Sequence, residues 1–172
     1  SVHGTNLSAL LIHLEHNPVL SKLPEIKERF WDCVLIDGFI NNNDRNSGNW
    51  GVLIDRDETL KLAPVYDNGA AFSNKLSDQQ IQAILNDPVR LKQSAIMNIS
   101  SGYLDNGKSI YFEKLIKQDY PDLKASIIRV VPKMKGKMEA IRSFILDIPT
   151  EYSKIAVMSS ERKEFYIKGL EY

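Results

Sequence analysis

The sequence lacks an excess of charge of either sign. It has 22 Lys and Arg against 22 Asp and Glu, so its formal net charge at pH 7 is zero. A neutral chain sets up no global field that attracts nucleic acid or an anionic bilayer. We therefore expect no direct nucleic-acid binding and no electrostatic attachment to a membrane.

Cysteine and long apolar runs are also scarce. The single cysteine, Cys33, excludes an internal disulfide framework and suits a reducing compartment. No run approaches the roughly 18 apolar residues of a membrane span, and the start of the chain lacks the pattern of a secretory signal. We expect a soluble, cytoplasmic protein. Because the chain begins with Ser1 and not Met, we also expect a processed or excised piece.

The chain has enough apolar residues for one core. With 172 residues, 43% of them hydrophobic, it suits one domain, residues 1–172, better than two. Asn6 is placed to cap a first helix that Asn17-Pro18 ends, and Pro24 suits the first turn of a second helix, 25–40. The second helix is apolar almost all round in its last turns, which predicts a central, buried position. Gly38 within it indicates a closely packed neighbour.

The rest of the pattern is mainly helical. Between the second helix and the next one, apolar residues alternate over 50–54 and again over 60–64, which predicts a hairpin. Helices are predicted at 78–86, 88–98, 108–118, 121–131, 134–146 and 159–170, with breaks at "SSGYLDNGK" and "LDIPTEY". The predicted fold class is therefore mainly α, a helical bundle with one small β-hairpin.

An unusually Asn-rich stretch, "NNNDRNSGN", joins the second helix to the hairpin. Such residues ordinarily form a turn. However, each predicted strand spans roughly 17 Å at about 3.3 Å per residue, so the return strand brings Asp67 back beside Asn49. Asp44 lies on the same loop as Asn49. Two carboxylates and one carboxamide therefore converge at the end of the buried helix and the foot of the hairpin.

This set of side chains suits magnesium-dependent phosphoryl transfer. Mg²⁺ takes oxygen ligands and is usually held by one or two carboxylates together with the phosphates of the substrate. We predict that Asn49 and Asp67 bind Mg²⁺ and thereby ATP. Asp44 is predicted to be the catalytic base that orients the acceptor hydroxyl and takes its proton.

The spacing Asp44-x-x-x-x-Asn49, followed by Asp67-x-Gly69, resembles the catalytic loop and the metal-binding Asp-Phe-Gly of protein kinases. More closely, "NNDRNSGNWGVLI" with "LAPVYDNG" resembles the C-terminal domain of HipA-like serine/threonine kinases, the bacterial toxin and translocated-kinase group. The close match covers residues 39–72. The resemblance implies a kinase C-lobe, the same three site residues, a protein substrate with a Ser or Thr acceptor, and an antitoxin-like partner. It also adds a second possible location, that of a translocated or secreted effector.

The chain departs from ordinary kinases in several places. Arg45 follows the catalytic aspartate instead of preceding it, Asn68 replaces the usual Phe, and Asn46 stands where related loops often carry His. No Gly-rich loop and no strand lysine precede the catalytic loop. The nucleotide-binding N-lobe is thus absent from these residues. The chain is then an excised C-lobe, one of two separate polypeptides, or a degenerate relative without catalysis.

Other interpretations of these residues were considered. An EF-hand starting at Asn42 does not fit, because it would have Ser47 where Gly is required and Leu53 where Glu is required. A plain turn, a non-catalytic binding module and a lipid or small-molecule kinase stay open. We also expect Cys33 to be a buried apolar residue, Asp37 to bond to the catalytic loop, and Tyr66 to pack.

Overall fold

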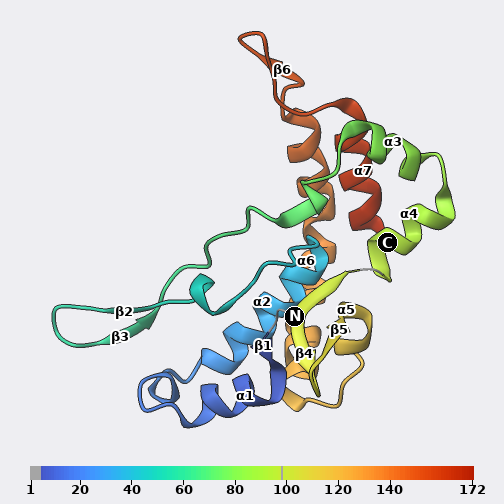
Figure 1. Cartoon of the computed structure of the whole chain (residues 1–172). Coiled ribbons are helices and arrows are strands. Elements are labelled where there is room, and N and C mark those ends of the chain that lie inside the picture. Colours follow the sequence, from blue (N-terminus) through green and yellow to red (C-terminus); the bar gives the residue numbers. More distant parts are fainter. Residues whose placement is uncertain (1–4, 98) are drawn as a thin grey trace.

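The computed structural model describes residues 5–97 and 99–172, and it is mainly helical. Figure 1 shows the central helix α2 (Ile26–Phe39) beside the long helix α6 (Pro121–Asp147). The last helix, α7 (Ser160–Glu171), returns along the C-terminal part of α6. A hairpin of β2 (Val52–Ile54) and β3 (Leu60–Leu62) projects from the middle of the chain.

The first two helices agree with the sequence pattern. A short strand, β1 (Thr5–Asn6), leads into α1 (Leu7–His16), where the side chain of Asn6 accepts a hydrogen bond from the backbone N–H of Ala9. A turn of 3₁₀ helix, η1 (Leu20–Lys22), connects α1 to α2. Helix α2 is buried as predicted. At Gly38 an added Cβ would lie 2.1 Å from the Phe112 ring, so the expected close neighbour is confirmed.

The predicted hairpin is present, with strands shorter than 50–54 and 60–64. Its strands are antiparallel, Val52 faces Leu62, and the N–H of Ala63 continues the ladder to the carbonyl of Gly51 at 2.9 Å. The chain that follows β3 therefore returns alongside the residues that precede β2.

The predicted helix 108–118 is wrong. Residues Lys108–Tyr111 form β5, which pairs with β4 (Ser100–Asp105), and only Phe112–Leu115 form a short helix, α5. The reason is Asn106-Gly107, because both residues have positive φ (48° and 75°) and make the two-residue turn that favours a hairpin. Strand β1 adds to β4 in parallel and completes a three-stranded sheet.

The prediction of only one hairpin is wrong for a second reason. The predicted break "LDIPTEY" contains β6 (Glu151–Tyr152), which pairs with β7 (Ile155–Ala156). Between them Ser153 and Lys154 both have positive φ, 49° and 67°. The tight turn lies in residues that carry no Gly, so this hairpin has no recognisable turn signal in the sequence.

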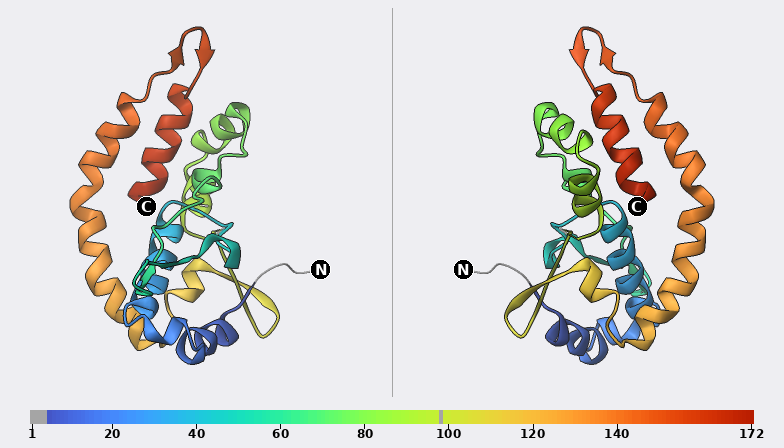
Figure 2. Two further views of the ribbon diagram at one scale, coloured as in Figure 1. Left: turned by 90° about the vertical axis from the view of Figure 1, so that its left-hand side faces the viewer. Right: turned by 90° about the vertical axis from the view of Figure 1, so that its right-hand side faces the viewer.

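The long helix α6 replaces the two predicted helices 121–131 and 134–146, so that prediction is wrong as well. Pro132 lies inside α6. It lacks the N–H that would bond to the carbonyl four residues earlier, yet Val130 before it and Met134 after it pack against the same apolar cluster. Packing on both sides of Pro132 keeps the helix continuous, and α6 is bowed in Figure 2.

The remaining helices begin at the residues that the caps indicate. Helix α3 (Asp78–Leu85) has a capping box from Ser77 and Gln80, and α4 (Pro88–Ile96) is capped by Asp87. Ser159 caps α7. Two short 3₁₀ turns, η2 (Ser47–Asn49) and η3 (Ala71–Ser73), lie on the loops that flank the β2–β3 hairpin. Among the described helices, none is both long and apolar enough to cross a bilayer.

The apolar residues form two clusters. The first joins α1, α2, the β4–β5 sheet and the first half of α6, and the second joins α3, α4, α7 and the second half of α6. Their buried members are Leu7, Leu14, Leu23, Ile26, Phe30, Trp31, Val34, Leu35, Tyr103, Ile110, Leu115, Leu123 and Val130 in the first, and Ile81, Ile84, Leu91, Ile145, Phe165, Tyr166, Ile167 and Leu170 in the second. Cys33 is buried and free, as expected. Because α2 packs in the first cluster, the Asn-rich loop that follows it begins at the end of a well-packed helix.

Candidate functional site

The asparagines of the loop that follows α2 shape its backbone. Asn41 turns the chain with a left-handed φ of 52°, and its side chain donates a 2.8 Å hydrogen bond to the hydroxyl of Ser73. Asn42 is 2% exposed and donates to Asp37 through both its backbone N–H (2.7 Å) and its side-chain amide (2.8 Å). Turn chemistry therefore explains part of the Asn-rich stretch.

Asp44 and Asn49 are joined within this loop. The side-chain amide of Asn49 donates to the backbone carbonyl of Asp44 at 3.0 Å, and that of Asn46 donates to the same carbonyl at 3.1 Å. These bonds fix the backbone of Asp44 and leave its exposed carboxylate unbonded within the described residues. Asn46 also accepts from the N–H of Gly48 at 2.9 Å, so it has a structural role at the position where related loops often carry His.

Asn49 has an oxygen available for a ligand. The residue is 9% exposed, and its Nδ2 makes the bond to Asp44, whereas its Oδ1 accepts no hydrogen bond from any described residue. An amide held by its nitrogen presents its oxygen in a fixed direction. That arrangement suits coordination of a hard cation.

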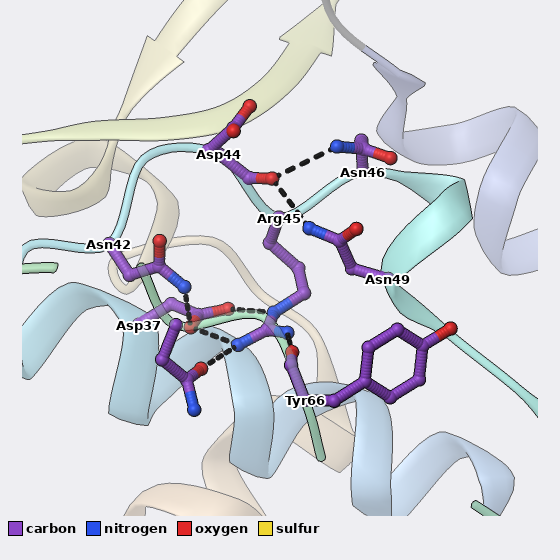
Figure 3. Close-up of polar contacts among 8 residues, drawn as sticks. Asp37, Asn42, Asp44, Arg45, Asn46, Asn49 and Tyr66 are labelled. Carbon is purple, nitrogen blue, oxygen red and sulfur yellow. Dashed lines mark hydrogen bonds and ion pairs between the residues drawn. The ribbon is translucent and has the colours of Figure 1, made fainter. Parts of the chain in front are cut away.

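Arg45 points to the opposite side of the loop from Asp44 (Figure 3). Its side chain is 3% exposed and pairs with Asp37, whose side chain is 9% exposed. Two bonds of 2.8 Å join the pair, from Nε to one carboxylate oxygen and from Nη2 to the other. The hydrogen bonds that Arg45 donates to Asp37 raise the pKa of Arg45. The expected bond from Asp37 to the catalytic loop is confirmed, and its partners are Arg45 and Asn42.

Two further donors of Arg45 reach the second loop of the site. Nη1 donates to the carbonyl of Tyr66 at 2.6 Å, and Nη2 donates to Oδ1 of Asn68 at 2.6 Å. Asp67 lies between these two contacts, exposed and with a left-handed φ of 59°. The structure thus connects the two loops that carry the predicted site residues, through a side chain that the sequence had marked only as a departure from the kinase pattern.

Tyr66 is expected to pack, but it is 41% exposed and belongs to neither apolar cluster. Its ring lies beside Gly51, and its hydroxyl is 2.8 Å from the carbonyl of Gly48 and 2.9 Å from that of Trp50. The hydroxyl donates its one proton to either carbonyl. The residue before Asp67 is therefore attached to the end of the Asn-rich loop as well as to Arg45.

The two predicted metal ligands, Asn49 and Asp67, both offer oxygen atoms. Over residues 5–97 and 99–172, no group of three or more His, Cys, Asp and Glu side chains gathers in a way that could hold a metal. Asp67 and Asn49 offer one carboxylate and one carboxamide, which fits Mg²⁺ bound together with substrate phosphates and water and does not fit a closed structural metal centre.

Sequence reasoning predicted the bond of Asp37 to the loop, but it missed that Arg45 is the partner and that Arg45 also bonds to Tyr66 and Asn68. One signal could have found the role of Arg45. A carboxylate at Asp37 in an apolar helix requires a partner, and Arg45, on the loop directly after that helix, is the first arginine that follows it.

Comparisons with known proteins extend this picture. No protein-family model matches the chain. In sequence it is 29% identical over 166 residues to the serine/threonine-protein kinase CtkA of Helicobacter pylori strain J99. The match covers 94% of this chain and 47% of that protein.

A solved structure agrees. The chain superposes on the crystal structure of a Helicobacter pylori proinflammatory kinase, CtkA, with a TM-score of 0.84 and 27% identity. That superposition covers 98% of this chain and 59% of the solved one. The chain is similar to a serine/threonine kinase. It spans about half the length of the curated relative, and the match supports the mainly helical, kinase-like fold.

Proposed function

We propose that this chain is the catalytic C-lobe of a HipA-like serine/threonine protein kinase. It transfers the γ-phosphoryl group of ATP to a Ser or Thr hydroxyl of a protein substrate with Mg²⁺. The observation that carries the proposal is the connection of the Asp44–Asn49 loop to the loop around Asp67 through Arg45, in a chain similar to a serine/threonine kinase.

Asp44 acts as the general base. Its carboxylate is exposed, while Asn46 and Asn49 hold its backbone, so the side chain is free to meet an acceptor hydroxyl. Asp44 accepts the hydroxyl proton as the acceptor oxygen bonds to the γ-phosphorus. The bond between that phosphorus and the oxygen bridging to the β-phosphate breaks, and ADP leaves with the bond's electron pair.

Asn49 and Asp67 bind the metal that accompanies the nucleotide. When bound, Mg²⁺ neutralises charge that develops on the phosphate oxygens. The protein's own contribution is position, since Asn49 is held by its amide nitrogen and Asp67 lies between two anchored residues. Positioning accounts for most of the catalysis in phosphoryl transfer.

The Gly-rich loop that covers the ATP phosphates belongs to an N-lobe outside these 172 residues. That lobe is either on the same polypeptide or on a separate one. The support is that the chain corresponds to 47% of the length of its relative, so that half of a similar kinase lies beyond the match. We place residues 1–172 as a single C-lobe domain. The kinase acts in the bacterial cytoplasm under an antitoxin-like partner, or as an effector delivered elsewhere.

Radioactive phosphate transfer from ATP tests the proposal. In the complete protein, Asp67→Asn removes one carboxylate from an open site and is expected to abolish magnesium-dependent incorporation while the fold stays intact. Asp119→Asn is the matched control, because that carboxylate is also exposed (90%) and lies outside both loops.

The outcomes separate the candidates. Transfer to protein that requires Asp67 supports the protein kinase. Transfer only to a lipid or small molecule would mean that the chain belongs to a lipid or small-molecule kinase and not to a protein kinase. A folded, complete wild-type protein that binds a partner and transfers no phosphate is the non-catalytic binding module.

A further inference from the structure

We propose that Arg45 is a positioning residue that holds Asp67 in its left-handed conformation, so that the metal-binding carboxylate is in place before metal or nucleotide binds. This inference rests on the proposed function. It adds a residue that does not touch the substrate and acts through the residues on either side of Asp67, the backbone carbonyl of Tyr66 and the side chain of Asn68.

The first step is the backbone of Asp67. Its φ of 59° lies in the left-handed region, which is unfavourable for any residue with a Cβ, although Asp tolerates it better than most. Outliers of this kind persist only where the surroundings hold them, and they gather at functional sites. A holding contact is therefore required next to Asp67.

The second step is the position of the contacts. Arg45 bonds to the carbonyl of Tyr66 and to the side chain of Asn68, the residues immediately before and after Asp67, each at 2.6 Å. A guanidinium has five N–H donors in a rigid plane, so it can bond to both neighbours and to a carboxylate together. A lysine ammonium cannot reproduce this geometry.

The third step is the rigidity of Arg45 itself. Asp37 fixes it by two bonds of 2.8 Å, and Asp37 belongs to the buried end of α2, where Asn42 supports the same carboxylate. A buried ion pair is weak evidence for added stability, because desolvation opposes the attraction. Here the pair has a second role, since two further N–H groups of Arg45 bond to the Asp67 loop.

The loop is also held on its far side. The N–H of Phe72 donates to the carbonyl of Ile40 at 2.7 Å, and the N–H of Ala71 donates to the carbonyl of Asn68 at 3.1 Å. Asn68 thus takes part in both the Arg45 contact and the turn after it. Loss of the Arg45 contact is expected to release the segment from Tyr66 to Ala71.

The experiment uses Asn68→Ala in the complete protein. Asn68 is exposed, so its truncation removes one of the two contacts of Arg45 with the loop, without opening the core, and leaves the bond to the Tyr66 carbonyl. Asn86→Ala is the matched control, because Asn86 is also exposed and accepts a side-chain bond from Gln82 through its Oδ1. Arg45→Lys is the second variant. It keeps the positive charge opposite Asp37 but loses the planar set of guanidinium donors.

Phosphate transfer is measured against Mg²⁺ concentration, with the thermal midpoint of each variant. We expect Asn68→Ala to raise the half-saturating Mg²⁺ concentration by roughly 10- to 100-fold, the usual effect of removing a residue that supports a metal ligand. Its midpoint is expected to match that of Asn86→Ala, whose Mg²⁺ dependence stays at the wild-type value. Arg45→Lys is expected to shift the dependence in the same direction.

Hydrogen exchange of the peptide 66–73 gives a readout independent of activity. Arg45→Lys and Asn68→Ala are expected to lose protection at Ala71, and Asn86→Ala to keep it. If both readouts stay at wild-type values while Asp67→Asn is inactive, the positioning role is overturned and the proposed function stands. If Asp67→Asn is fully active, the proposed function fails. In that case, unchanged hydrogen exchange of the peptide 66–73 in Arg45→Lys overturns the positioning role of Arg45 as well.

Discussion

Arg45 and Asp37 form a buried, two-pronged ion pair between the Asn-rich loop and the last turns of α2, with both N···O distances at 2.8 Å. The pair connects the most buried helix of the chain to the loop that presents Asp44. Because Arg45 also bonds to both neighbours of Asp67, one side chain joins the two loops of the candidate site.

Removing the acidic partner should destabilise the fold. Asp37→Ala leaves the guanidinium of Arg45 buried without its counter-ion, which typically costs about 3 to 5 kcal/mol. Urea unfolding measures this as a lower midpoint at an unchanged slope. Asp55→Ala, which breaks an exposed pair with Lys61, is the control and should leave the midpoint nearly unchanged. Equal midpoints for the two variants would refute the importance of the buried pair.

The close contact at Gly38 predicts an unusual response to alanine. Gly38→Ala puts a Cβ 2.1 Å from the Phe112 ring, and overpacking of this kind costs about 1 to 3 kcal/mol, more than the roughly 1 kcal/mol that alanine gains in helix propensity. Gly136→Ala in α6 meets nothing within 4 Å and should stabilise the protein. Calorimetric midpoints that move the same way in both variants would contradict this packing.

Burial of Cys33 predicts a pH dependence at alkaline pH. Burial, with a smaller effect of Asp37, raises the pKa of the Cys33 thiol from 9.0 to about 11. Between these values the unfolded chain has released the thiol proton and the folded chain keeps it, so the free energy of unfolding falls as pH rises from 9 to about 11. Cys33→Ala should lack this part of the slope in denaturant titrations. An identical slope in the variant would show that other groups cause it.

The chain alone should be a poor enzyme. Without a Gly-rich loop and a strand lysine, residues 1–172 are expected to bind ATP weakly and to turn over negligibly, because positioning of the phosphates is missing. Isothermal titration calorimetry tests this directly. Submicromolar ATP affinity of the isolated chain would show that no further lobe is needed for binding.

Much of the fold follows from local signals. Asn6 caps the first helix as predicted, and the helices predicted at 78–86 and 159–170 are present, with caps at Ser77 and Ser159. The alternation after Asn49 predicts the β2–β3 hairpin. The errors arise where a turn or a tertiary contact outweighs the helix-forming tendency of the local sequence. Asn106-Gly107, in a predicted break, turns the chain so that Lys108–Tyr111 pair as a strand where a helix was predicted, and packing on both sides of Pro132 keeps α6 continuous.

The candidate site divides in the same way. The residue types at Asp44, Asn49 and Asp67 suggest a phosphoryl-transfer site because their chemistry is visible in the sequence. The function of Arg45 is not visible, since it depends on the carbonyl of Tyr66 and on contacts between loops that are distant in the chain. A backbone acceptor leaves no trace in residue identity, so such a contact requires the structure.

The most direct test of the central claim is the rate of phosphate transfer by Asp44→Asn in the complete protein, measured with its thermal midpoint. Asn46 and Asn49 bond to the backbone carbonyl of Asp44 and not to its side chain, so the substitution keeps the shape of the loop. Asn cannot accept the hydroxyl proton, and the rate should drop by roughly 10² to 10⁴ fold while the midpoint stays at the wild-type value. A folded Asp44→Asn protein with wild-type turnover would contradict the catalytic assignment and leave the Asn-rich stretch as a turn.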